Sequence, residues 1–339
     1  MHCRPGLHAN QNAESDKPRG AIQDMSYSLE QALPAVVRRD VEYGETHAPP
    51  MPEEMPEVVR ADPGWAMQWT RMRDAIADGA LMEAGHKTSK AKGKAGADRR
   101  KHAAEYLAMM GHLEFDLIVR GCAYAAHKYD MPLPWKMSIL KQGQDDMAHA
   151  AGFIASASRL AEHDYWQGVK APYQKTIKYY QPILERDLGG FLAAVGLHTE
   201  AYPAWTNLVG GSAITDPVVG AWALSEIEDE AWHLSFLYPA MNEWLHTGTP
   251  EQQHARKQQL VEDNEILLEQ IQASSYQNAK DYAVGRLGMD PKVLFGHEHI
   301  HERTRYIFRS LNIEESYWPE YLRQVDDLPE LAGAYECVV

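Results

Sequence analysis

Apolar residues recur every three to four positions along most of this chain, from Trp65 onward, and the apolar–polar alternation that marks β-strands is almost absent. The pattern therefore predicts an all-α fold. Breaker residues divide the centre of the chain into four long helical segments, over about residues 98–129, 135–163, 184–209 and 217–244. A further helix is expected over about residues 250–286, before a C-terminal stretch rich in histidine and aromatic residues.

The pattern also suggests three regions. Residues 1–60 are rich in proline and glutamate and have no sustained period, which predicts an extended N-terminal arm. Residues 61–250 contain the four long segments and are expected to form a four-helix bundle with flanking helices. Residues 251–339 are expected to form a helical extension packed on that bundle.

Composition narrows the class of function. The 339 residues are 45% apolar and carry a net charge of −15, which disfavours nucleic acid and anionic membranes as partners, because phosphates are bound by surplus lysine and arginine. Three scattered cysteines, Cys3, Cys122 and Cys337, do not make a disulfide framework and favour a reducing cytoplasm. No apolar stretch approaches the roughly 18 residues that cross a bilayer, so neither export nor membrane insertion is expected.

Two carboxylate–histidine pairs, Asp146/His149 and Glu230/His233, lie inside the second and fourth helical segments. Residues three apart share a helix face, so both members of a pair can reach one ion. Other pairs with this spacing stand among polar or lysine-rich residues, whereas these two share their faces with apolar residues. Both pairs are therefore predicted to be buried.

The first and third segments each carry one carboxylate on an apolar stripe, Glu114 and Glu200, at nearly equal distances before the two pairs. An isolated buried carboxylate costs on the order of several kcal/mol, so four of them with two histidines call for a compensating cation. Oxygen and imidazole ligands without thiolate suit iron or manganese; zinc also accepts them, and copper fits less well.

This pattern resembles the ligand set of ferritin-like di-iron and di-manganese bundles. In those bundles two helices each supply one Glu, and two other helices each supply an acid-x-x-His pair. Asp146 departs from that set, in which the residue is Glu. Its side chain is one methylene shorter, which either lengthens the distance between the two metals or makes this carboxylate terminal instead of bridging.

Longer motifs resemble one family of this superfamily, the bacterial multicomponent monooxygenases, which include the soluble methane, toluene, phenol and alkene monooxygenase hydroxylases. Residues 225–233, Ser-Glu-Ile-Glu-Asp-Glu-Ala-Trp-His, with Tyr238-Pro239 soon after, are similar to the family's Asp-Glu-x-Arg-His segment. Residues 144–149, Gln-Asp-Asp-Met-Ala-His, look like its partner motif, and Glu200 with Thr206-Asn207 is similar to the family's Glu-bearing helix. The resemblance covers roughly residues 95–245.

The resemblance implies a site with two iron ions. Glu114, Asp146 and His149 would bind one ion, and Glu200, Glu230 and His233 the other, so the four carboxylates would be catalytic groups. Asp145 and Asp229 would orient the ligand histidines, a role that metal chemistry asks for independently.

Three further residues beside these motifs, Ala148, Trp232 and Glu226, bear on the predicted site. The arginine that the family places before each histidine is Ala148 in one motif and Trp232 in the other. Glu226, one turn before Glu230, is either an additional acid of the site or a partly solvated residue.

The resemblance also implies an activity. Such a protein uses dioxygen as co-substrate to hydroxylate or epoxidise a small apolar or aromatic molecule. Its electrons would come from an electron-transfer reductase, because the chain has no glycine-rich dinucleotide motif and no cysteine cluster for an iron–sulfur centre. A small effector protein and a homo- or hetero-oligomeric assembly are further expected partners.

Three alternatives stay open. The stretch from Tyr165 to Asn207 is similar to the family's non-catalytic β subunit, so the chain could be a metal-free scaffold. A ferritin-like store of iron or manganese would use the same ligands. A radical-generating ribonucleotide reductase subunit would need a tyrosine a turn beyond the first carboxylate, where this chain has Ile118.

Two polar clusters fall outside the predicted site. The first is basic and is read either as a solvated loop or as a dock for an acidic redox partner; it comprises Lys87, Lys90, Lys92, Lys94, Arg99, Arg100 and Lys101. The second alternates His297, His299 and His301, a spacing that favours neither a helix face nor an apolar setting.

Overall fold

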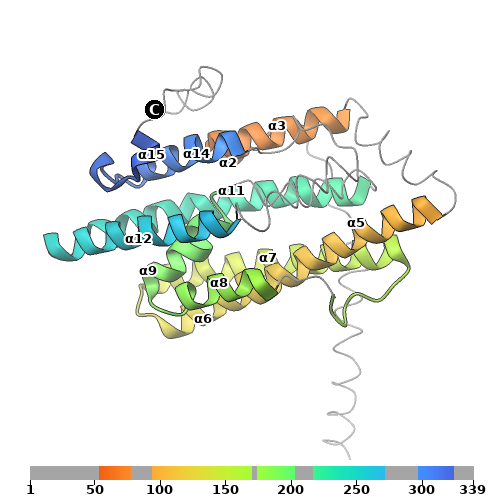
Figure 1. Ribbon diagram of the computed structural model, residues 1–339, viewed down its shortest axis with the longest axis horizontal. Coiled ribbons are helices and arrows are strands. Elements are labelled where there is room, and N and C mark those ends of the chain that lie inside the picture. The colour runs from red at the N-terminus through yellow and green to blue at the C-terminus, as the bar shows by residue number, and fades with distance from the viewer. Residues whose placement is uncertain (1–52, 78–93, 170–173, 203–216, 272–296, 324–339) are drawn as a thin grey trace, which may run out of the picture.

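The computed structural model describes residues 53–77, 94–169, 174–202, 217–271 and 297–323. Within these ranges the chain is helical and no strand occurs, which confirms the all-α prediction (Figure 1). In chain order the longer helices are α3 (Pro63–Ala77), α5 (Lys94–Leu113), α6 (Arg120–Lys128), α7 (Leu133–Ala161), α8 (Gln174–Leu184), α11 (Pro217–His246), α12 (Pro250–Ile271) and α14 (His297–Ser310). The shorter ones are α2 (Glu57–Arg60), α9 (Leu188–Phe191), η6 (Glu315–Tyr317) and α15 (Glu320–Arg323).

Two stretches are π-helices, in which backbone hydrogen bonds span five residues instead of four: η1 (Glu114–Val119) joins α5 to α6, and η2 (Leu192–Thr199) continues α9. Such stretches are rare and often lie at functional sites, because the added residue re-aims side chains. Both carry a predicted ligand, since η1 begins at Glu114 and η2 is followed directly by Glu200.

Three of the four long helices lie where the sequence predicts them. The first runs without interruption through α5, η1 and α6. Helix α7 begins after Pro132, and it ends at Ala161, because the left-handed backbone of the next residue, Glu162 (φ 51°), cannot continue the helix. Helix α11 begins at Pro217, as predicted, and α12 matches the fifth prediction as far as the structure describes it, to Ile271.

The helix predicted over about residues 184–209 is shorter in the structure, where the continuous helical run covers residues 188–199. Helix α8 ends at Leu184, and a new helix begins after Asp187, whose carboxylate accepts a hydrogen bond from the backbone N–H of Gly190 at 2.7 Å. That N-cap starts a separate helix. Helix η2 then ends at Thr199, while residues 203–216, with the Thr206-Asn207 of the family resemblance, lie outside the described residues.

The helices pack closely around α7 and α11. Figure 1 shows α5 and α6 beside α7, and α11 lying between this group and the layer formed by α3 and α14. Two glycines permit close approach: a Cβ on Gly111 of α5 would lie 2.6 Å from the carbonyl oxygen of Ala150, and one on Gly152 of α7 would lie 2.7 Å from the Trp222 ring. Backbones therefore pack against their neighbours without intervening side chains at these points.

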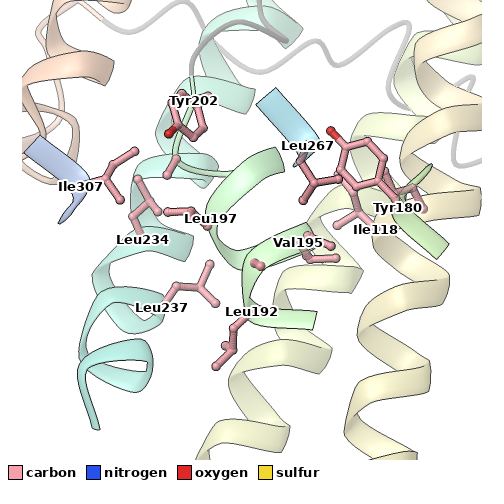
Figure 2. Close-up of a cluster of buried hydrophobic side chains, with 14 of the residues drawn as sticks. Ile118, Tyr180, Leu192, Val195, Leu197, Tyr202, Leu234, Leu237, Leu267 and Ile307 are labelled. Carbon is pink, nitrogen blue, oxygen red and sulfur yellow. The ribbon is translucent and has the colours of Figure 1, made fainter. Parts of the chain in front are cut away.

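The core surrounds η2. Figure 2 shows apolar side chains of η2 in one cluster with those of neighbouring helices; the labelled residues include Leu192, Val195, Leu197, Leu234, Leu237, Ile118 and Leu267. Burial of η2 is complete along its length. The segment that directly precedes Glu200 therefore lies wholly within the core.

The two ends of the described chain also join this core. Helix α2 lies in the segment predicted to be an extended arm, and its Val59 is fully buried; residues 1–52 of that segment lie outside the described residues. The expectation for the histidine cluster is wrong, because His297 to His301 open helix α14 and His299 is buried. Its Nε2 lies 3.3 Å from an Arg71 guanidinium nitrogen, which supplies the polar contact that a buried imidazole needs.

The basic cluster is not a loop throughout. Helix α5 begins at Lys94, so the cluster's last members are helical, while Lys87, Lys90 and Lys92 lie outside the described residues. Among the described helices, none combines the length and the apolar character that crossing a membrane requires.

Candidate metal centre

The six predicted ligands come from four helical segments that meet in the core. Glu114 is the first residue of η1, and Glu200 follows the last residue of η2. The two carboxylate–histidine pairs stand near the middle of α7 and α11, each on one face, as predicted. All six side chains are buried, with at most 5% of any residue exposed: Glu114, Asp146, His149, Glu200, Glu230 and His233.

Four of the six lie within reach of a single ion. One ligand atom each from Asp146, Glu200, Glu230 and His233 lies within 4.8 Å of the others. The Nδ1 atom of His233 is 2.8 Å from Glu200 Oε2 and 3.6 Å from Glu230 Oε2. Three helical segments thus direct oxygen and nitrogen donors at one small volume, and the cluster could hold a metal ion.

Glu114 and His149 adjoin this group without belonging to it. The Nδ1 atom of His149 is 3.8 Å from Asp146 Oδ1. The pKa of Glu114 is raised first by burial and then by the charges of Glu226, Asp146 and Glu200, so its carboxyl group shares their electrostatic environment. The six residues form a tight group of four with two neighbours beside it.

Two aspartates hold the histidines in a crossed arrangement. Asp229 Oδ2 lies 2.9 Å from His149 Nε2, and Asp145 Oδ2 lies 3.4 Å from His233 Nε2. Each aspartate therefore contacts the histidine of the other motif, as antiparallel packing of α7 and α11 allows. Because Nε2 is used in both rings, Nδ1 is the nitrogen left facing the carboxylates.

Asp145 is itself anchored, since Lys141 donates a hydrogen bond to it. Burial raises the pKa of Asp145, but hydrogen bonds from His233 and Lys141 outweigh it, so the net shift is downward and the group stays ionised. An ionised partner fixes the imidazole tautomer and raises its basicity as a metal ligand. Trp232, which directly precedes His233, is 57% exposed.

Without a cation, burial and mutual repulsion disfavour the ionised form of most carboxyl groups in the centre. Burial, followed by neighbouring carboxylates, raises the pKa of Asp146 and of Glu230 well above the ordinary range. The exception is Glu200, whose pKa is lowered overall. Burial raises this pKa, but the hydrogen bond with Glu230 and the charge of His233 outweigh the effect of burial. A proton on Glu230 and one on His233 stand in for the positive charge that a metal would bring.

Several buried polar atoms of the site have no hydrogen-bond partner among the described residues. Both oxygens of Asp146 are unpartnered, although this residue is completely buried. The other unpartnered atoms are Glu114 Oε2, His149 Nδ1, Glu226 Oε2 and Glu230 Oε2. Buried polar atoms are nearly always satisfied, and these are the atoms that a cation would engage, so the residues fit a bound metal.

Glu226 belongs to the site. It is 2% exposed, so the partly solvated alternative is wrong. Burial and the charges of Glu200 and Asp229 raise its pKa to about 8, which leaves it protonated at neutral pH. Its position four residues before Glu230 was the signal for this placement.

Sequence reasoning missed three neighbours of the centre. The hydroxyl oxygen of Thr199, the residue directly before Glu200, lies 3.1 Å from Glu200 Oε1. Cys122 is buried beside the cluster, and burial followed by the charges of Asp146 and Glu200 raises its pKa. Gln142, one turn before Asp146, is completely buried and unpartnered, which its spacing could have indicated.

Comparisons of this chain with models of known families, with curated proteins and with solved structures found no match. The assignment of the centre accordingly rests on the burial, spacing and unpartnered atoms of its own residues.

Proposed function

We propose that this protein is a di-iron oxygenase whose hydroxylase centre is formed by Glu114, Asp146, His149, Glu200, Glu230 and His233. The observation that carries the proposal is Asp146: a completely buried carboxylate with both oxygens unpartnered, within 4.8 Å of three other donors. A structural role in the core would have paired those oxygens with hydrogen-bond donors.

Charge balance supports two divalent ions. Four ligand carboxylates neutralise two divalent cations when both histidines are neutral, and the fifth buried acid, Glu226, is then accommodated as a neutral carboxylic acid. Asp146 is grouped with Glu200, Glu230 and His233, so its carboxylate would hold a metal ion together with these three side chains. Oxygen and imidazole donors without thiolate favour iron, with manganese as the alternative metal.

The ligand count supports catalysis over a closed structural site. Four carboxylates and two imidazoles leave coordination positions open, whereas structural sites are closed by protein ligands. When bound, two ferrous ions would supply the electrons and open positions with which dioxygen is activated. Asp145 and Asp229 engage the Nε2 atoms of the two histidines, which leaves both Nδ1 atoms free to bind metal. The neutral Glu226 holds a proton close to the centre.

The surroundings favour a small apolar or aromatic substrate. Buried apolar side chains on η2 and α11 stand close in the chain to the ligands and offer no group that would recognise a polar molecule; they include Leu197, Ile227 and Leu234. Electrons would come from a separate reductase, and assembly with an effector or a second subunit belongs to the same proposal.

Metal content is the first test. Protein expressed with iron should contain about two ions per chain, and His233→Ala should lose them while its far-ultraviolet circular dichroism stays helical. Isolation without metal, together with failure to load iron or manganese, would refute the proposal and favour a scaffold.

Reaction with oxygen is the second test. The iron-loaded protein is reduced anaerobically and mixed with dioxygen in a stopped-flow instrument. A transient visible band that decays faster with an apolar substrate, and a hydroxylated or epoxidised product, are expected. Slow oxidation to ferric iron that no substrate or reductase affects would assign the protein to iron storage.

A further inference from the structure

The main chain beside Glu200 is held by two side chains from distant parts of the sequence. The indole Nε1 of Trp65 on α3 donates a hydrogen bond of 3.2 Å to the carbonyl oxygen of Glu200. The Nε atom of Arg303 on α14 donates one of 2.6 Å to the carbonyl oxygen of Ala201. Carbonyl groups at the end of a helix lack helical partners, so these two donors satisfy atoms that the end of η2 leaves exposed.

Both donors are themselves fixed by one carboxylate. Asp62 accepts two hydrogen bonds from the Arg303 guanidinium, at 2.6 and 2.9 Å. It also accepts the backbone N–H groups of Gly64 and Trp65, at 3.0 and 3.1 Å, and so begins helix α3. One buried residue thus sets the positions of both side chains that reach the end of η2.

The space around these contacts leaves no room for adjustment. Trp65 and Arg303 are at most 1% exposed, and the guanidinium lies against the backbone of Gly64, where a Cβ would come within 2.7 Å of it. A two-pronged ion pair enclosed in this way is rigid, because the planar guanidinium and the carboxylate match in only one orientation.

Glu200 needs such support more than the other ligands do. The two carboxylate–histidine pairs and Glu114 lie within continuous helices, whereas Glu200 stands where η2 stops. Its carboxylate must still reach His233 Nδ1 at 2.8 Å and Thr199 Oγ1 at 3.1 Å. A ligand at a helix end is displaced easily unless its main chain is held.

We propose that Trp65 and Arg303, oriented by Asp62, are positioning residues that hold the Glu200 carboxylate in the metal centre. The inference rests on the proposed function, since it takes Glu200 to be a metal ligand. It assigns α3 and α14, which contribute no ligand, a defined part in metal binding. Partners in the shell around metal ligands typically change affinity by about 10- to 100-fold when removed.

Trp65→Phe is the central variant, and Trp69→Phe is its matched control. Both tryptophans are buried on α3, but Trp69 Nε1 has no partner in the described part of the chain, so its removal costs packing without costing this hydrogen bond. Affinity for Co²⁺ is measured by competition with a chelator, and the visible bands of the saturated protein report the coordination of the ion.

Trp65→Phe should weaken Co²⁺ binding by about tenfold or more and shift the visible bands at full loading. Trp69→Phe should leave both unchanged, with a similar loss of thermal stability. Equal affinities and spectra for the two variants would overturn the inference. If Trp65→Phe does not fold, a benzothienylalanine at this position, with sulfur in place of the N–H, repeats the comparison with the ring shape kept.

The wild-type measurement separates the two proposals. Absence of Co²⁺, Fe²⁺ and Mn²⁺ binding by the wild-type chain would refute the metal centre itself. If the wild type binds metal and the Trp65→Phe and Trp69→Phe variants bind it with equal affinity and equal spectra, only the positioning role is refuted. Arg303→Lys, which keeps a charge for Asp62 but loses the Nε donor, should reproduce the spectral shift of Trp65→Phe.

Discussion

The Nε2 atom of His149 lies 2.9 Å from Oδ2 of Asp229, an acid that belongs to the other carboxylate–histidine motif. The reciprocal contact joins His233 to Asp145. Each motif thus supplies one ligand histidine and the aspartate that orients the histidine of the other motif. Loss of either aspartate should therefore disturb a ligand on the opposite helix, which an intrahelical arrangement would not predict.

Removing one of these two aspartates should weaken metal binding without unfolding the protein. Asp229→Asn keeps the size of the side chain and removes the charge that orients His149, so metal affinity should fall by about 10- to 100-fold. Glu228→Gln, at the neighbouring position on α11, should change affinity little. Chelator competition measures both, and an unchanged affinity in Asp229→Asn would contradict the bracing role.

Metal removal should destabilise the fold by an amount that grows with the logarithm of the metal concentration relative to the dissociation constant. A ligand that binds only the folded state, at 100 times its dissociation constant, adds about 2.7 kcal/mol to the free energy of unfolding. Addition of Fe²⁺ or Mn²⁺ under anaerobic conditions should raise the melting temperature of the metal-free protein, and a chelator should reverse it. A melting temperature that does not respond to either metal would argue against the centre.

Asp146→Asn should separate stability from metal binding. In the metal-free protein both oxygens of Asp146 are buried and unpartnered, so replacing a potential charge by a neutral amide should raise the free energy of unfolding at pH 8 by roughly 1–3 kcal/mol. The same variant should no longer respond to metal. Asp116→Asn, which removes a surface ion pair with Arg120, should alter stability by less than about 1 kcal/mol and keep the response.

Glu226 should make the stability of the metal-free protein fall as pH rises. Its pKa is about 8 in the folded state against an ordinary 4.5, so between these values the folded state holds a proton that the unfolded state has released. Stability from this group is complete below about pH 4.5 and lost as pH rises through 8.

Glu226→Gln should remove that contribution and flatten the dependence by up to about 1.4 kcal/mol per pH unit. Urea unfolding between pH 5 and 9 measures the slope, with Glu243→Gln on the exposed side of α11 as control. Equal slopes in wild type and Glu226→Gln would show that Glu226 is ionised in the folded protein.

The spacing within each motif was predictable because it depends only on local geometry. His149 is three positions after Asp146, and a helix places residues so spaced on one face whatever surrounds it. The apolar neighbours of that face indicated burial, and the structure places both residues in the core. The same reasoning placed Glu200 in the core, but it missed the helix bounds around this residue, because the helix begins only after the N-cap Asp187 and its last turns are π-helical.

The sequence alone determined the helical class, the faces of α7 and α11, and the residue types of the centre, since helical periodicity and burial of apolar side chains act over a few residues. Tertiary structure alone decided which aspartate meets which histidine, because that depends on the direction in which α7 and α11 pack. It also decided that Arg303 reaches Asp62 and Ala201, contacts that span up to 241 residues of chain. No local pattern encodes such pairs, because only the folded core brings their segments within hydrogen-bond distance.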